Sequence, residues 1–415
     1  MSGHAAANNR SMQPGIGKEA QANAAYPGFH GTVAALSIGQ ILCWASMFYG
    51  FSSFVLPMQR EFHWDEPTLM AALTLGFAVW GAAAYAVGAA IDRGHGRTVM
   101  TGGVLLGAMG FFAWSFVSQP WMLAAVWVLL GAAMAMTLYD PAFMVLTKRY
   151  PLRYREGITA LTLVGGFAST LSFPAVNVLL AAFGWRDALR LIALVLLLVA
   201  LPLHGWALRG PNIVVGPHHD GMAADTTMRE AFQVPAFWLL AFCFTLYAFA
   251  SAALWAHVMP IFVSKGFDAL QATAVLVWFG PAQVFGRVAY AWLGRGLPLR
   301  RMGVVVLLGI PLSLALLALA RTQGLLVVFA LLFGMANGLI TILRAAIVPE
   351  YFGRAHVGRI SGAMTAFSLL ARAAAPLLAA WMLLWMGGYP PVLMVLVGLG
   401  LAAVAAFVLA RPPRR

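Results

Sequence analysis

The chain has 415 residues, of which 62% are hydrophobic and 9% charged, and its formal net charge is +13. A soluble domain has roughly 25% charged residues, so this chain has too little polar surface to be a soluble globular protein. The basic residues stand in short loops between apolar stretches, which excludes a nucleic-acid-binding face. We find no catalytic signature and no nucleotide-binding glycine loop with lysine, so we expect no enzyme, no cofactor and no direct ATP hydrolysis.

Residues 1–30 lack the basic start and apolar run of a signal peptide, and we expect a disordered cytoplasmic tail there. Twelve apolar stretches follow, close to the roughly 20 residues that a bilayer-spanning helix needs and without the alternation of β-barrel strands. We expect the first and seventh of them to end at Pro57 and Pro260. The predicted spans lie near residues 33–57, 68–91, 98–118, 122–147, 157–182, 188–208, 235–263, 269–293, 302–320, 324–347, 358–386 and 390–410.

Most of the 26 Lys and Arg residues fall in loops on one side of the predicted membrane. Positive loops mark the cytoplasmic side, so both chain ends are expected in the cytoplasm, which requires an even number of spans. We therefore predict a multi-pass protein of the bacterial inner membrane. Its parts are an N-terminal six-helix bundle at 31–208, a cytoplasmic linker at 209–232, a C-terminal six-helix bundle at 233–410 and a short cytoplasmic tail at 411–415.

The two predicted bundles are related in sequence. Ile158 and Pro174 match Ile360 and Pro376 at one common offset. Parallel repeats of six helices enclose solute pathways between them. The expected fold class is an all-α membrane protein with twelve helices in two pseudo-symmetric bundles.

The segment from Gly88 to Arg97 reads GAAIDRGHGR and stands between the second and third spans. It resembles the G-x-x-x-D-R-x-G-R signature of the Major Facilitator Superfamily, with one extra residue before the last glycine. Gly88 permits close helix contact, and Asp92 at a helix end can meet a cation or the N-terminus of a helix in the other bundle. The resemblance implies a gating motif made of Gly88, Asp92, Arg93, Gly96 and Arg97, whose arginines anchor at the lipid headgroups.

Two looser motifs resemble the bacterial monocarboxylate and oxalate/formate branch of that superfamily. They are RYPLRYREG at 149–157 and GPAQVFGR at 280–287. The resemblance implies a mono- or dicarboxylate substrate. In related carriers, arginines of the eighth and eleventh spans contact carboxylates, which implies the same role for Arg287 and Arg372.

Few ionisable residues fall inside the predicted spans, where a charge costs roughly 2.5–3.5 kcal/mol and therefore marks a functional candidate. Arg287, Arg344 and Arg372 outnumber Asp140, so the cavity should attract an anion that the planar guanidinium fits. The alternative for Arg287 and Arg372 is a strut between helices. The repeat offset places Arg344 next to Asp140, so we expect these two side chains to meet.

Asp140 is a candidate proton carrier, a partner of Arg344, or both in alternation. His257 is a candidate for proton coupling, and the alternative is an interfacial hydrogen-bonding residue. His218, His219 and Asp220 resemble a metal cluster, but a solvated linker and no metal site are expected there. The predicted substrate-binding residues are Arg344, Arg287, Arg372, Asn337, Tyr139, Tyr49 and Trp44.

Three functions remain open. The first is a secondary carrier of a small organic anion, with proton symport or anion exchange, in which the two halves rock around a central site. The second is an exporter of amphipathic drugs or other xenobiotics, which the aromatic-rich helices allow. The third is a transporter-like solute sensor, for which no tail or linker is large enough to signal. The arginine excess favours the first, and we expect a monomer in the bilayer with an anionic solute and protons as partners.

Overall fold

The computed structural model describes residues 28–210, 225–267, 269–293 and 296–412. Most of the predicted N-terminal tail, the middle of the predicted linker with His218, His219 and Asp220, and residues 413–415 lie outside this part of the chain. The described residues form helices and no strands. Helices satisfy every backbone polar group within one segment, as a bilayer requires.

The first half of the chain contains α-helices with two short π-helical segments, η1 and η2. They are α2 (Phe29–Cys43), η1 (Trp44–Tyr49), α3 (Phe51–Phe62), α4 (Glu66–Asp92), α5 (Gly96–Trp114), α6 (Pro120–Thr137), α7 (Tyr139–Arg149), α8 (Tyr154–Gly165), α9 (Ala168–Val195), η2 (Leu196–Ala200) and α10 (Leu201–Ala207).

The second half repeats this order with fewer interruptions. Its helices are α11 (Met228–Gln233), α12 (Pro235–Ser264), α13 (Ala269–Leu276), α14 (Phe279–Leu293), α15 (Leu299–Leu319), α16 (Gln323–Phe352), α17 (Val357–Met386) and α18 (Tyr389–Leu409).

Nine segments of the described chain are by themselves long and apolar enough to cross a membrane. The other crossings are made by α5, by α8 with the first part of α9, and by α13 with α14. α9 bends at Gly184, whose φ of 74° and ψ of 169° disfavour any residue with a Cβ, and the bend separates the fifth span from the sixth. The predicted twelve-helix fold is confirmed.

The prediction that proline ends the first span of each half is wrong. α3 continues through Pro57 to Phe62, and α12 continues through Pro260 to Ser264. Proline is tolerated inside membrane helices because neighbouring groups satisfy the carbonyl that it frees. The end of the predicted linker is also partly helical, because Thr227 and Glu230 form a capping box that starts α11.

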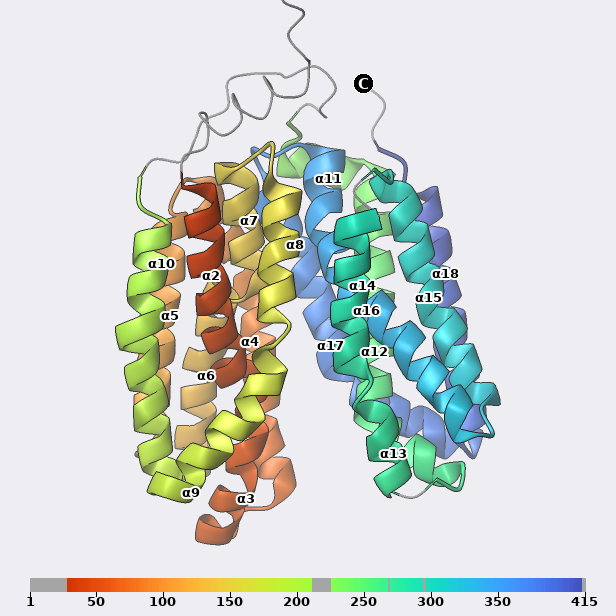
Figure 1. Ribbon diagram of the computed structural model, residues 1–415, viewed down its shortest axis with the longest axis horizontal. Helices are drawn as coiled ribbons and strands as arrows, with labels where there is room; N and C mark the ends of the chain where they lie inside the picture. The colour runs from red at the N-terminus through yellow and green to blue at the C-terminus, as the bar shows by residue number, and fades with distance from the viewer. Residues whose placement is uncertain (1–27, 211–224, 268, 294–295, 413–415) are drawn as a thin grey trace, which may run out of the picture.

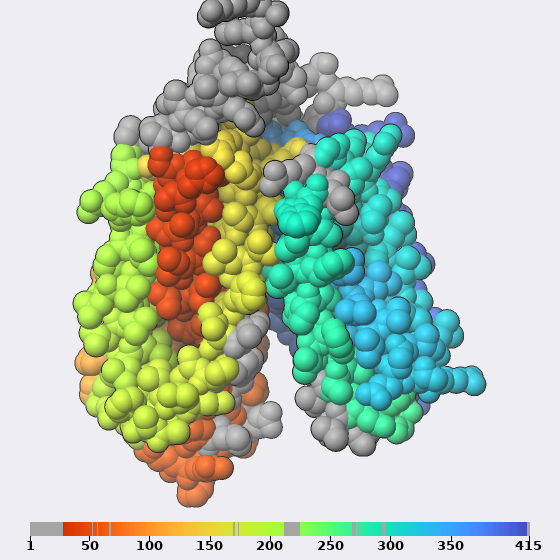
Figure 2. All heavy atoms as spheres, viewed as in Figure 1, coloured from red at the N-terminus to blue at the C-terminus, as the bar shows by residue number. Residues whose placement is uncertain are grey.

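The two halves lie side by side and approach each other at the end that carries α11 (Figure 1). They diverge towards the end that carries α3 and α13, where the space-filling view shows a hollow between them (Figure 2). We call these the closed end and the open end. Across the boundary, α4 packs on α17, and α8 packs on α14 and α16.

Candidate functional site

A cavity of about 750 Å³ lies between the two halves. It is large enough for a small organic molecule. Every residue predicted to bind substrate lines it, as does Asp140, whereas His257 does not. The predicted residues on its wall are Trp44, Tyr49, Tyr139, Asp140, Arg287, Asn337, Arg344 and Arg372.

Breaks in the helices of the first half place side chains in this cavity. The π-helical turn of η1 puts Trp44, Phe48 and Tyr49 on one face, a distortion that occurs often at functional sites. The fourth span breaks at Leu138, so Asp140 falls in the first turn of α7. The positive end of that helix favours a carboxylate there.

The predicted meeting of Asp140 and Arg344 occurs. Arg344 Nη2 of α16 lies 3.7 Å from Asp140 Oδ1 of α7, and the two side chains are 27% and 24% exposed. Arg344 also donates a hydrogen bond to the Thr365 hydroxyl of α17. The pair therefore joins the two halves across the cavity, within reach of a bound solute.

Arg287 of α14 donates two hydrogen bonds to backbone carbonyls, one in each half of the chain. Its Nε donates to Gly338 O at 3.1 Å and its Nη1 donates to Thr162 O at 2.9 Å, and the residue is only 3% exposed. Thr162 lies in the last turn of α8, where the helix dipole favours a cation. This geometry agrees with the strut that the sequence left open for Arg287.

Arg372 of α17 lacks such partners. Its Nε is buried without a hydrogen-bond acceptor among the described residues. Asp140, the one acid among the described residues lining the cavity, forms its ion pair with Arg344 instead. A buried donor without an acceptor costs about 1–3 kcal/mol, so an anion at this position would be stabilised.

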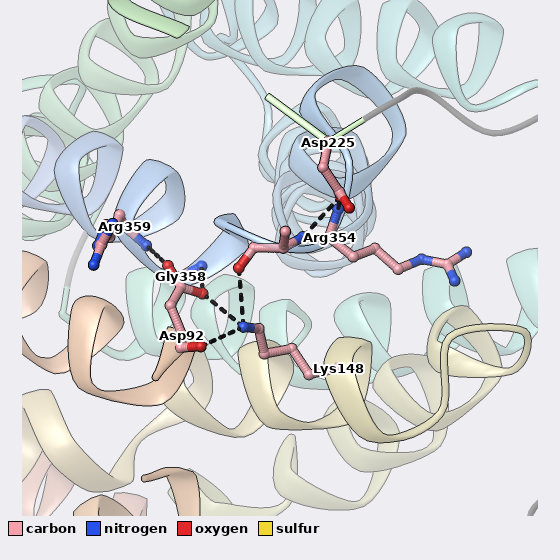
Figure 3. A network of polar contacts seen from close by, with 7 residues as sticks. Asp92, Lys148, Asp225, Arg354, Gly358 and Arg359 are labelled. Carbon is pink, nitrogen blue, oxygen red and sulfur yellow. Dashed lines mark hydrogen bonds and ion pairs between the residues drawn. The ribbon is translucent and has the colours of Figure 1, made fainter. Parts of the chain in front are cut away.

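At the closed end, Asp92 of α4 connects the first half to the start of α17 in the second half (Figure 3). Its carboxylate accepts hydrogen bonds from the backbone N–H of Gly358 at 2.9 Å and of Arg359 at 2.8 Å, at the start of α17. Lys148 Nζ lies 3.2 Å from Asp92 Oδ1 and donates to Ala355 O at 3.0 Å. The Asp92 side chain is 3% exposed, so these charge-assisted bonds are shielded from water.

The other residues of the predicted gating motif support this contact or face outward. Gly88 touches the backbone of Gly358, and a Cβ at Gly88 would collide with that carbonyl. Gly96 is buried at the start of α5, whereas Arg93 and Arg97 are exposed. Exposure of the two arginines is compatible with the predicted headgroup anchoring.

Two further contacts strengthen the closed end. Arg155 of α8 forms an ion pair with Glu350 of α16. Asp225, just before α11, accepts hydrogen bonds from the N–H of Arg354 at 2.8 Å and of Ala355 at 2.9 Å (Figure 3). Asp225 therefore holds the loop that receives Lys148.

Residues 36–320 match the family model of the Major Facilitator Superfamily. The chain belongs to the Major Facilitator Superfamily. It is therefore a membrane-embedded, multi-pass protein.

Two of the superfamily relatives show how far the likeness extends. Monocarboxylate transporter 13 of Rattus norvegicus is 29% identical over 295 residues, which cover 66% of this chain and 63% of that protein. The uncharacterized MFS-type transporter YcxA of Bacillus subtilis (strain 168) is 22% identical over 333 residues, which cover 75% of this chain and 78% of that one. The chain thus spans less than two thirds of the rat and bovine monocarboxylate transporter 13 sequences that it matches.

Solved structures of the superfamily share the fold. The human organic anion transporter MFSD10 superimposes with a TM-score of 0.71 at 17% identity, over 92% of this chain and 100% of that one. The E. coli fucose:proton symporter FucP superimposes with a TM-score of 0.74 at 11% identity, over 93% of this chain and 100% of that one. At such identities the likeness concerns the fold alone.

The cavity of this superfamily member is also lined by side chains that the sequence analysis did not assign to a site. Tyr247 donates a hydrogen bond to Asn337 Oδ1, and Thr365 receives Arg344. Phe48, Phe77, Trp80, Trp255 and Gln283 also line the wall. Aromatic residues are common throughout these spans, so no sequence signal separated the cavity rings from those that face lipid. His257 lies outside this wall, with Nε2 3.1 Å from Pro376 O.

Proposed function

We propose that this transporter is a secondary carrier of a small organic anion, a mono- or dicarboxylate, that works by alternating access. The observation that carries the proposal is the unbalanced guanidinium of Arg372 on the wall of the central cavity. An arginine stays charged at any physiological pH, and its fork matches a carboxylate. A substrate anion would supply the acceptor that Arg372 lacks.

The roles of the three arginines follow from their partners. Arg372 holds the anion, and Arg344 alternates between Asp140 and the substrate. Arg287 positions α14 against α8, because it donates hydrogen bonds to the backbone carbonyls of Thr162 and Gly338. Substrate binding thereby releases Asp140 from Arg344, which leaves its carboxylate available to a proton.

The cycle proceeds by rocking of the halves about this site. The Asp92 contacts break when the closed end opens, and the cavity then faces the other side of the membrane. Asp140 and His257 are the proposed proton-coupling residues, with anion exchange as the other source of energy. We place the protein as a monomer in a bacterial inner membrane, with both termini in the cytoplasm.

Uptake into proteoliposomes tests the function. Purified full-length protein should accumulate at least one member of a radiolabelled panel of mono- and dicarboxylates. Stimulation by an inward proton gradient indicates symport, and stimulation by unlabelled anion inside indicates exchange. Transport of cations with no transport of any carboxylate would refute the anion proposal.

Substitution of Arg344 tests its role in the same assay. Arg344→Lys keeps the charge but loses the two-pronged geometry, so affinity should fall by about 1–3 kcal/mol. Arg344→Ala should abolish transport, and the double variant Asp140→Asn/Arg344→Gln should recover stability without transport. Arg321→Gln, at an exposed arginine outside the cavity, is the matched control. Normal transport by Arg344→Ala would remove this residue from the site.

Thiol labelling tests the orientation. Cysteines introduced as Ala5→Cys, His218→Cys and Pro413→Cys should resist a membrane-impermeant reagent in intact cells and react after lysis. Cys43 and Cys243 are buried and should not interfere. Labelling of any introduced cysteine in intact cells would contradict cytoplasmic termini and linker.

A further inference from the structure

The wall that the first half contributes to the cavity is a continuous aromatic surface. The Trp44 ring centroid lies 4.7 Å from that of Tyr139, 5.0 Å from that of Phe48 and 6.1 Å from that of Trp80. Phe77 stacks on Phe48 at 5.7 Å and meets Trp80 at 6.1 Å. These five residues come from three separate segments, η1, α4 and α7, and we call them the ring wall.

The ring wall is held in place before any ligand arrives. Trp44 Nε1 donates to Gln40 Oε1 at 3.1 Å, and Gln40 Nε2 donates to Thr137 O at 2.6 Å. Thr137 ends α6, one residue before the break at Leu138. The same break that exposes Asp140 therefore also fixes Trp44, and a fixed surface loses little entropy when a ligand binds.

The second half faces this surface with positive charge. Tyr49, which adjoins the ring wall, lines the same cavity as Arg287 and Arg372. Arg287 bonds to two backbone carbonyls and Arg344 pairs with Asp140, whereas the buried Nε of Arg372 has no acceptor among the described residues. The wall of the cavity thus offers both a position for an anionic group, at Arg372, and a broad aromatic face.

We propose that the transported anion is an aryl monocarboxylate, a planar aromatic ring that bears one carboxylate. This inference rests on the proposed anion transport and narrows its substrate. The carboxylate binds Arg372, and the ring lies against the ring wall, where aromatic pairs add attraction beyond the area that they bury. A short acid such as acetate or oxalate leaves the ring wall uncovered, and the second carboxylate of a dianion would have to displace Asp140 from Arg344.

A matched panel tests the inference with the full-length protein in proteoliposomes. Phenylacetate and benzoate should be taken up in preference to acetate and oxalate. Benzamide, which keeps the ring but lacks the charge, should neither be taken up nor compete. Acetate or oxalate uptake equal to that of phenylacetate would overturn this inference and leave anion transport standing. Uptake of benzylamine without uptake of any anion would refute the proposed function itself.

Substitutions test separately the residues proposed to bind the aromatic ring and the residue proposed to bind the carboxylate. Phe48→Leu should raise the KM for phenylacetate by about 2- to 12-fold, the range for one aromatic pair. Phe112→Leu is the control, because Phe112 is 53% exposed on α5 and outside the cavity. Arg372→Gln should reduce binding of phenylacetate to the level of its amide, measured by thermal shift of the purified protein. Unchanged KM in Phe48→Leu, or wild-type phenylacetate binding in Arg372→Gln, would overturn the proposal.

Discussion

Two of the contacts between the halves are built from different kinds of residue. Between α4 and α17, small residues bring backbone against backbone, with Gly88 on Gly358 and Ala84 on Gly362. Between α8 and the pair α14 and α16, long cations reach across a looser boundary. We call the first the glycine seam and the second the arginine seam, which consists of Arg155 with Glu350 and Arg287 with Thr162.

The difference suits the two seams to different tasks. Two helices whose backbones pack closely are either in contact or separated, because the arrangements in between have high energy. A guanidinium on a flexible stem can keep or exchange an acceptor while the helices shift. We expect packing at the glycine seam to determine whether the closed end is open or shut. We expect the arginine seam to couple that conformational change to the cavity.

The largest effect is expected from a side chain inserted into the glycine seam. Gly88→Leu should shift the equilibrium away from the shut closed end by about 5- to 150-fold, because overpacking costs about 1–3 kcal/mol. Transport should be lost, and spin labels on α4 and α17 should report a longer distance. Gly398→Leu is the control, since nothing lies within 4 Å of a Cβ there. Normal transport by Gly88→Leu would contradict the role of this seam.

The next largest effect is expected in the arginine seam. Arg287→Leu removes two hydrogen bonds donated by a charged group, each of which contributes about 1.5–3 kcal/mol to stability. The carbonyls of Thr162 and Gly338 also lose this donor. The melting temperature of the purified protein should fall, and Arg287→Lys should recover part of it. If Arg287 instead binds substrate, Arg287→Leu will lose anion affinity with an unchanged melting temperature.

A smaller effect is expected from Asp92→Asn. The amide still accepts from Gly358 or Arg359 but loses the charge that Lys148 and the start of α17 complement, a change of about 1 kcal/mol or about fivefold in the closing equilibrium. Transport should slow at normal expression while substrate binding survives. Loss of binding together with normal conformational cycling would contradict the gating role.

The smallest effect is expected from Asp225→Asn. Asp225 is exposed, so its bonds to the N–H groups of Arg354 and Ala355 are screened by water, and the change should be about twofold in the same spin-label equilibrium. Asp187→Asn is the control, because Asp187 is an exposed acid that pairs with Arg190 three residues away. Equal effects of the two variants would show that the loop does not depend on Asp225.

Much of the fold followed from the sequence because the bilayer imposes it. A span must be apolar and long, so the twelve segments could be predicted, although the first and the seventh continue past the prolines at which they were expected to end. The cost of a charge in lipid likewise singled out Asp140, Arg287, Arg344 and Arg372, all of which line the cavity. The repeat offset was enough to pair Asp140 with Arg344.

Only the tertiary structure decided which arginine keeps a buried donor without an acceptor among the described residues. The acceptors of Arg287 are backbone carbonyls of Thr162 and Gly338, and every residue carries such a carbonyl, so no side-chain pattern could reveal them. The breaks at η1 and Leu138, which gather Trp44 and Tyr139 into one ring wall, depend in the same way on how the helices pack. The charge and hydrophobicity of a side chain follow from the residue type. Which backbone carbonyl accepts a hydrogen bond depends instead on which helices pack together.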